Sequence, residues 1–396
     1  MVAVTILLVF AAAASLFAAW TIGASSSGAT PFAPAVGANA LTTMRAAFIV
    51  GTLGFAGAVL QGAAVTETVG EGLIQGVTLS PIAATLALVI AAFYIGAGVF
   101  KGYPIATAFA ITGSVVGVGL AMGGEPAWGE YTEIGLYWLL TPVMVAPPSY
   151  VFTKLLLSDR VSNQRILPVF VAFVAVIVVH MEFLLLGSSG EEASIADTAA
   201  ATLADGAFVA EVAFTVVVAA VMALYTARAF GRHPFRTQRR FLLALGGLVA
   251  FTAGAGKVGL AVGPLLPLAD DVWGTVPITA ILLFGGVGIL AGSWMLAPRM
   301  IKALSQDYAM LGPDRSIGVL IPSFVIAQLG VFFGIPMSFN EIFISAIVGT
   351  GYAAGGSGVS REKLFYTTVI WIGSIIFSLV VGYVAFMGVE MAIEAL

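Results

Sequence analysis

The chain has 396 residues, of which 60% are hydrophobic and only 9% are charged, so most of its surface faces something other than water. The formal net charge of −4 excludes a basic field for nucleic acid, and the absence of cysteine excludes disulfides and cysteine-based metal sites. Apolar runs of about 18 residues or more recur along the chain, which predicts an all-α polytopic membrane protein.

Twelve membrane segments are predicted in chain order. They lie near residues 2–22, 44–64, 77–100, 104–123, 133–157, 165–188, 206–229, 241–256, 275–297, 317–333, 336–354 and 364–389. Two connections, 24–43 and 257–274, are apolar enough to re-enter the membrane instead of lying in water.

The positive charges predict the orientation. Alternating the twelve segments places every Lys and Arg except Lys257 on one side, and collects most acidic loop residues on the other. Because Lys and Arg are retained on the cytoplasmic side, both termini are predicted to lie outside the cytoplasmic membrane.

The order of the segments predicts an inverted repeat. Residues 1–157 and 241–396 each hold five segments, and residues 158–240 supply two linking helices and a basic cytoplasmic loop. Seven segments precede the second half, so that half enters the membrane from the opposite side. The fold class expected is therefore two inverted five-segment repeats with re-entrant or discontinuous helices.

Glycine and proline interrupt both halves at matching positions. The first pair of interruptions is 23–31 and 254–264, and the second pair begins at Gly102-Tyr103-Pro104 and Gly334-Ile335-Pro336. Paired interruptions of this kind are typical of a transporter's site at the membrane midplane. Backbone N–H groups freed at the start of a broken helix can bind an anion.

At these interruptions the chain resembles the inorganic phosphate transporter (PiT) family. That family has a duplicated G-A-N-D-x-A-N motif, each copy followed by a G-x-P-V-S-T-T-H-like segment. The stretch 65–69 is similar to the family's V-T-E-T-I, and Gly263-Pro264-Leu265 matches the residues after the family's second motif. The resemblance implies an inverted-repeat bundle in which re-entrant hairpins hold phosphate, with Na⁺ or H⁺ as the coupling ion.

The motif residues themselves depart from the family pattern. The N-D pair reads Ser26-Ser27 in the first copy and Gly256-Lys257 in the second, and the two histidine positions hold Phe109 and Glu341. Because both family aspartates are absent, Na⁺ coupling is disfavoured and H⁺ is the expected coupling ion. No metal site and no cofactor are predicted.

The candidate substrate-binding residues are those that the two pairs of interruptions supply. They are Ser25, Ser26, Ser27, Thr30, Pro104, Thr107, Gly254, Gly256, Lys257, Ser338 and Asn340. An intramembrane lysine usually faces a cavity or a partner, so Lys257 is expected to supply fixed positive charge in place of a bound cation. Glu341 is expected to carry the coupling proton and to pair with Lys257 when the site is empty.

Structural alternatives exist for each of these residues. Lys257 could snorkel to the outer interface, Glu341 could lie at that interface, and the hydroxyls could satisfy backbone carbonyls.

The expected function is phosphate transport by alternating access, and a sulfate or other oxyanion permease of the same fold is the alternative. Membrane lipid is expected to surround the protein, and a homodimer is compatible with the sequence. An anion channel needs a continuous pore, and a structural subunit would bind no ligand. An enzyme is not expected, because embedded ionisable residues are few and scattered.

Overall fold

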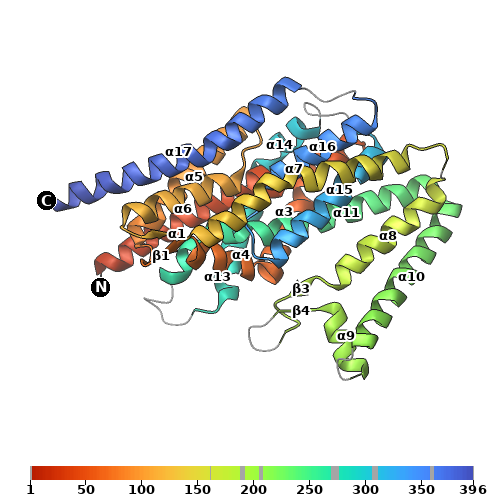
Figure 1. The fold of residues 1–396 in the computed structure, drawn as a ribbon, viewed down its shortest axis with the longest axis horizontal. Helices are drawn as coiled ribbons and strands as arrows, with labels where there is room; N and C mark the ends of the chain where they lie inside the picture. The colour runs from red at the N-terminus through yellow and green to blue at the C-terminus, as the bar shows by residue number, and fades with distance from the viewer. Residues whose placement is uncertain are drawn as a thin grey trace.

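The structure is a computed structural model that describes residues 2–160, 162–187, 192–204, 208–268, 276–305, 311–356 and 361–395. Nearly all of these residues are helical, and the helices run along the long axis of one bundle (Figure 1). Both termini lie at the same end of the bundle, opposite the junction between helices α10 and α11 (Figure 1).

The elements of the first predicted half are α1 (Val2–Ile22), the π-helix η1 (Gly23–Ser27), α2 (Ala33–Gly37), α3 (Thr43–Gln61), α4 (Ala63–Glu67), η2 (Thr68–Gly72), β1 (Ile74–Gln75), α5 (Pro81–Lys101), α6 (Thr107–Ala121), β2 (Glu125–Pro126) and α7 (Trp128–Leu156). The linking elements are α8 (Asn163–Val179), β3 (Glu182–Phe183), β4 (Ala193–Ser194), α9 (Ile195–Ala204) and α10 (Phe208–Arg232). The second half contains α11 (Pro234–Val262), η3 (Gly263–Leu265), α13 (Ile278–Met295), α14 (Ala297–Ala303), α15 (Pro313–Phe332), α16 (Phe339–Ala353) and α17 (Arg361–Glu394).

Each of the twelve predicted segments overlaps one of these helices, and the chain is a multi-pass membrane protein. Among the described residues, nine helices are long and apolar enough to cross a membrane. The other three, α6, α8 and α16, have 15, 17 and 15 residues. At 1.5 Å per residue, helices of that length are shorter than a hydrocarbon core of about 30 Å. The number of full crossings therefore stays a prediction.

Two predicted boundaries are wrong. The segment expected near residues 165–188 is helical only to Val179 and is followed by the short strand β3. The segment expected to end near residue 256 continues without a break to Val262, so the second Gly-rich stretch is helical over most of its length. The reason lies in packing: a Cβ atom at Gly254 would come within 1.8 Å of the carbonyl oxygen of Gly54 on α3. The glycine serves close helix contact here, as small residues do in membrane bundles. The remainder of the predicted connection to residue 274 extends past the described residue 268.

The two Pro-led interruptions have the same backbone geometry. Helix α5 is followed by Gly102 at φ 73°, and α15 by Gly334 at φ 66°. In each turn the next amide bonds back to a helix carbonyl, Tyr103 to Gly98 at 2.9 Å and Ile335 to Gly330 at 2.8 Å. This is a left-handed glycine helix end. The prolines after these turns keep the chain from continuing as a helix before α6 and α16 begin.

Helices of each predicted half pack on helices of the other half. Helix α6 packs on α17 while α16 packs on α7, and α3 packs on α11 while α1 packs on α13. Both α6 and α16 make the contact through a glycine, because a Cβ at Gly117 or at Gly349 would lie 2.1 Å from a carbonyl oxygen of the partner helix. These matched contacts support the predicted inverted repeat, which stays a prediction.

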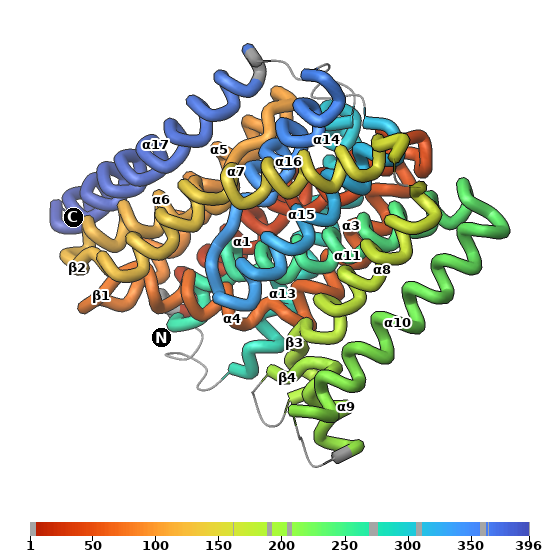
Figure 2. The backbone as a smooth tube through the Cα atoms, turned by 45° about the vertical axis from the view of Figure 1, so that its right-hand side comes forward, coloured from red at the N-terminus to blue at the C-terminus, as the bar shows by residue number. Residues whose placement is uncertain are grey.

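Helices α8, α9 and α10 lie to one side of the bundle (Figures 1 and 2). His180 joins the two longer ones: its Nδ1 lies 3.5 Å from Glu211 and its Nε2 lies 3.1 Å from the hydroxyl of Thr215. The two matched pairs of interruptions lie in the main body of the bundle.

Candidate functional site

The candidate site is built around Lys257, whose side chain is fully buried near the C-terminal end of α11. Its ammonium group donates hydrogen bonds to the hydroxyl of Thr107 at 2.8 Å and to the carbonyl oxygen of Met337 at 2.5 Å. It also lies 5.6 Å from the centre of the Phe339 ring, in reach of a cation–π contact. The alternative of a lysine snorkelling to the interface is therefore excluded in this conformation.

The two hydrogen bonds of Lys257 reach one Pro-led turn in each half. Thr107 is the first residue of α6, and Met337 immediately precedes the N-cap of α16. The amide of Asn340 ties the same turns together, donating to the carbonyl of Ile105 at 2.6 Å. The N-termini of α6 and α16 thus meet at Lys257. Each contributes partial positive charge and free N–H groups.

The first Gly/Ser-rich stretch reaches this cluster through Ser26. The hydroxyls of Ser26 and Thr107 lie 3.2 Å apart, and both side chains are buried. Ser26 belongs to the π-helix η1, so the predicted interruption takes the form of a widened helical turn. Its neighbour Ser25 is also buried, and its hydroxyl has no hydrogen-bond partner among the described residues.

Several polar atoms at the start of α16 lack partners. Ser338 caps the helix by accepting a hydrogen bond from the amide of Glu341 at 3.4 Å. Within the described part of the chain, Oδ1 of Asn340 and Oε2 of Glu341 are buried without a hydrogen bond. Buried polar atoms are rarely left unsatisfied. These atoms therefore mark a place that water, a proton or a ligand completes.

The expected ion pair between Lys257 and Glu341 is not formed. No nitrogen–oxygen distance within 4 Å joins them, and Lys257 is bound by Thr107 and the Met337 carbonyl instead. A hydroxyl and a carbonyl leave the positive charge of the ammonium unneutralised, which favours an incoming anion. Glu341 is nevertheless only 5% exposed, so the alternative of an interfacial carboxylate is not what the structure shows.

Other candidate residues serve the local fold. The hydroxyls of Ser27 and Thr30 bond the backbone carbonyls of Ile22 and Ser26, as the structural alternative for hydroxyls expected. Gly256 lies against Val331 and Phe339, so it and Gly254 are packing positions.

Sequence reasoning missed a reciprocal pair of tryptophans. The indole N–H of Trp371 on α17 donates to the carbonyl of Pro104 at 2.8 Å, and that of Trp138 on α7 donates to the carbonyl of Pro336 at 2.9 Å. Each tryptophan thus holds the Pro-led turn of the other half, and the carbonyl that the candidate residue Pro104 contributes is already occupied. The available signal was an indole within the last segment of each half, since a buried Trp needs an acceptor.

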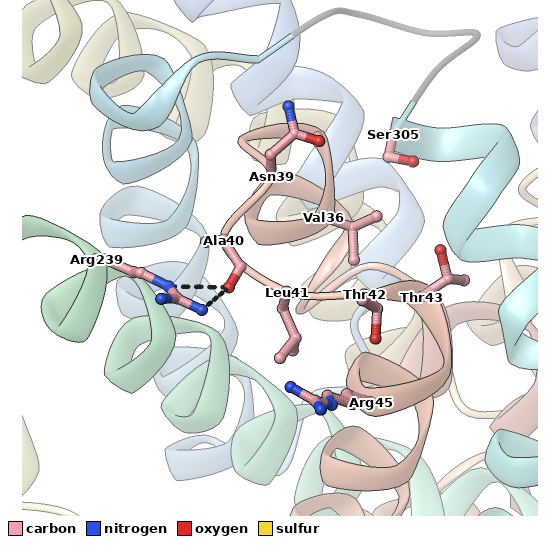
Figure 3. Close-up of a pocket in the computed structure, with 10 residues that line it drawn as sticks. Val36, Asn39, Ala40, Leu41, Thr42, Thr43, Arg45, Arg239 and Ser305 are labelled. Carbon is pink, nitrogen blue, oxygen red and sulfur yellow. Dashed lines mark hydrogen bonds between the residues drawn. The ribbon is translucent and has the colours of Figure 1, made fainter. Parts of the chain in front are cut away.

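A second polar feature lies at the end of the bundle that carries the α10–α11 junction, here called the basic end. A cavity of about 540 Å³ opens between the 38–42 loop, the start of α3 and the start of α11 (Figure 3). Arg45 and Arg239 line it, together with Asn39, Thr42 and Thr43.

Comparison with known proteins gives a consistent result. Residues 22–382 match the family described as the phosphate transporter family. A Thermococcus kodakarensis protein that carries the name putative phosphate permease is 27% identical over 384 residues, which cover 89% of this chain and 90% of that protein. The chloroplastic inorganic phosphate transporter 2-1 of Arabidopsis thaliana is 25% identical, over 91% of this chain and 68% of the relative.

A solved structure shares the fold. A protein described as the sodium-dependent phosphate transporter superposes with a TM-score of 0.81 at 24% identity, covering 97% of this chain and 99% of the other. The match of the family over most of the chain and the shared fold agree with the resemblance seen in the two pairs of interruptions. The chain belongs to the phosphate transporter family.

Proposed function

We propose that the protein carries inorganic phosphate across the cytoplasmic membrane, with both termini outside, and binds the anion at Lys257, Thr107, Ser26 and Asn340. The observation that carries the proposal is the position of Lys257. A buried ammonium group, two helix N-termini and several hydroxyl and amide groups meet where the two halves touch. Phosphate needs a cation, hydroxyls and N–H donors, and this set supplies them.

In the proposed cycle, Lys257 exchanges partners. With no anion bound, its ammonium is shared by the Thr107 hydroxyl and the Met337 carbonyl, one from each half. An arriving phosphate takes over these hydrogen bonds and accepts others from Ser26 and Asn340. The two Pro-led turns are then no longer joined through Lys257 and can move relative to each other, each still held by the tryptophan of the other half. Alternating access results from this exchange.

The fixed charge of Lys257 replaces that of a coupling sodium ion. The motif positions that hold acidic residues in the family hold Ser27 and Lys257 here, so the anionic oxygen ligands of a sodium site are missing from the motif. Glu341, buried beside the site with an unpartnered oxygen, is the group that would take up the coupling proton.

The test is uptake of labelled phosphate into proteoliposomes, with and without Na⁺, at two pH values. Uptake that persists without Na⁺ and is lost in Lys257→Ala supports the proposal. A strict requirement for Na⁺ would overturn the fixed-charge mechanism, because the cation would then be using other ligands.

Sulfate is the second candidate substrate, because the same donors suit any tetrahedral dianion. Competition with unlabelled sulfate decides between them. If labelled sulfate is carried faster than phosphate, the protein is a sulfate permease with this fold.

A further inference from the structure

The charged residues that line the cavity at the basic end are both positive. Among the described residues that line it, Arg45 and Arg239 are cationic, Asn39, Thr42, Thr43 and Ser305 are polar, and none is acidic. Figure 3 shows Arg239 beside the loop at Ala40 and Arg45 below the loop at the start of α3, with the Leu41 side chain between them. Two cations on the wall of one cavity make its potential positive, which attracts an anion.

Arg239 is held in place by the loop. Its Nε and one of its terminal nitrogens donate to the carbonyl of Ala40 at 3.0 and 2.8 Å (Figure 3). Both bonds use one edge of the planar guanidinium, so its remaining N–H groups stay available for another acceptor. Arg45 has no hydrogen bond or ion pair to any other described residue.

The surrounding groups complete an anion site. Thr42 is the N-cap of α3 and its hydroxyl makes no capping bond, so the hydroxyl and the first N–H groups of α3 are free to donate. Arginine forks bind phosphate oxygens in pairs of parallel hydrogen bonds. A volume of 540 Å³ accommodates a phosphate with part of its water shell.

We infer that this cavity is a second phosphate-binding site, separate from Lys257, which receives the anion at the basic end of the protein. The choice of phosphate as the ligand rests on the proposed function. The cavity joins α2 and α3 of the first half to α11 and Ser305 of the second. A phosphate that bridges Arg45 and Arg239 ties the halves together, so accumulated phosphate on this side slows further transport.

Binding of labelled phosphate to the whole purified protein in phosphatidylcholine nanodiscs tests the inference. The wild type is expected to bind two phosphates, and Lys257→Met is expected to bind only the one in the cavity. Arg45→Gln is expected to keep the phosphate at Lys257 and to bind the phosphate in the cavity at least tenfold more weakly. Arg232→Gln, an exposed arginine at the same end that does not line the cavity, is the matched control and keeps both. If Arg45→Gln lowers the unfolding temperature, Thr42→Val carries the test, since this hydroxyl caps nothing.

The outcomes separate the two proposals. One site that disappears with Lys257→Met and is indifferent to Arg45→Gln overturns the second site and leaves the proposed function intact. One site that disappears with Arg45→Gln alone overturns the function and supports the cavity. Replacing part of the lipid with phosphatidylglycerol distinguishes free phosphate from a lipid headgroup. If this lipid removes the Arg45-dependent site, the cavity takes a headgroup and the inference is wrong.

Discussion

Replacing Lys257 with methionine should separate stability from transport. Methionine has a similar length and no charge, so the variant keeps the volume of the side chain while it removes the ammonium group and its bonds to Thr107 and Met337. We expect a protein that folds about as stably as the wild type and no longer binds phosphate at the site.

Two opposing terms set the magnitude for stability. Burying an ammonium costs several kcal/mol even after the protein relaxes around it, and no carboxylate of the described residues lies within 4 Å of Lys257 to offset that cost. Two hydrogen bonds from a charged donor return about 1.5–3 kcal/mol each. The terms nearly cancel, so the substitution should change the free energy of unfolding by less than about 2 kcal/mol.

Phosphate binding should change far more. A unit charge about 4 Å from the anion contributes about 4 kcal/mol at the effective dielectric constant of about 20 found near protein sites. Losing that attraction weakens binding by two to three orders of magnitude, since about 1.4 kcal/mol corresponds to a factor of ten.

The assay pairs thermal unfolding with phosphate binding and proteoliposome uptake. Lys154→Met is the control, because it makes the same substitution at an exposed lysine on α7. The reasoning is refuted if Lys257→Met unfolds more easily by about 3 kcal/mol or more while its folded fraction still transports phosphate. Lys257 would then be a structural residue.

Individual contacts support three other predictions. Glu341→Gln should abolish the response of uptake to an imposed pH gradient, and an unchanged response would remove the proton-carrying role. Gly117→Ala places a Cβ 2.1 Å from a carbonyl oxygen of α17 and should destabilise the protein by about 1–3 kcal/mol. The control Gly373→Ala, whose Cβ meets no atom within 4 Å, should leave stability unchanged. Equal unfolding temperatures for the two variants would contradict the close packing of α6 on α17. Burial, followed by the carboxylates of Glu182 and Glu67, raises the pKa of Glu192 from 4.5 to about 7, so the folded state holds this proton more tightly than the unfolded state. Stability should therefore fall as pH rises from 4.5 through 7, by about 1–2 kcal/mol after allowance for solvent screening, and Glu192→Gln should flatten that slope in unfolding measurements.

The helices could be predicted because the membrane imposes one rule on every segment. Each apolar run must satisfy its own backbone, so length and hydropathy alone locate the helices. The same rule explains the error at the end of α11. Gly254 and Gly256 look like helix breakers, yet a glycine in a membrane helix also lets two backbones touch, and only the position of Gly54 on α3 shows which use applies.

The site was predictable only in part. A lysine among apolar residues indicates a functional charge by its cost, which is how Lys257 was identified. The hydrogen-bond partners of Lys257 could not be predicted in this way. Thr107 and the Met337 carbonyl come from two helices whose approach depends on contacts far along the chain. The reciprocal bonds of Trp138 and Trp371 end on backbone carbonyls, which no side-chain pattern reveals.

Under the proposed function, these contacts give the candidate binding site a mechanical role. Trp371 of the second half holds the turn before α6, Trp138 of the first half holds the turn before α16, and Lys257 is bonded to both turns at once. A relative movement of the two turns must therefore break at least one bond of Lys257. In the empty protein that leaves a buried charge with fewer partners, which opposes the movement. A bound phosphate supplies replacement partners and lowers that cost. Under the proposed function, the lysine that attracts the anion also makes movement without the anion unfavourable, which is what a carrier requires to avoid moving empty.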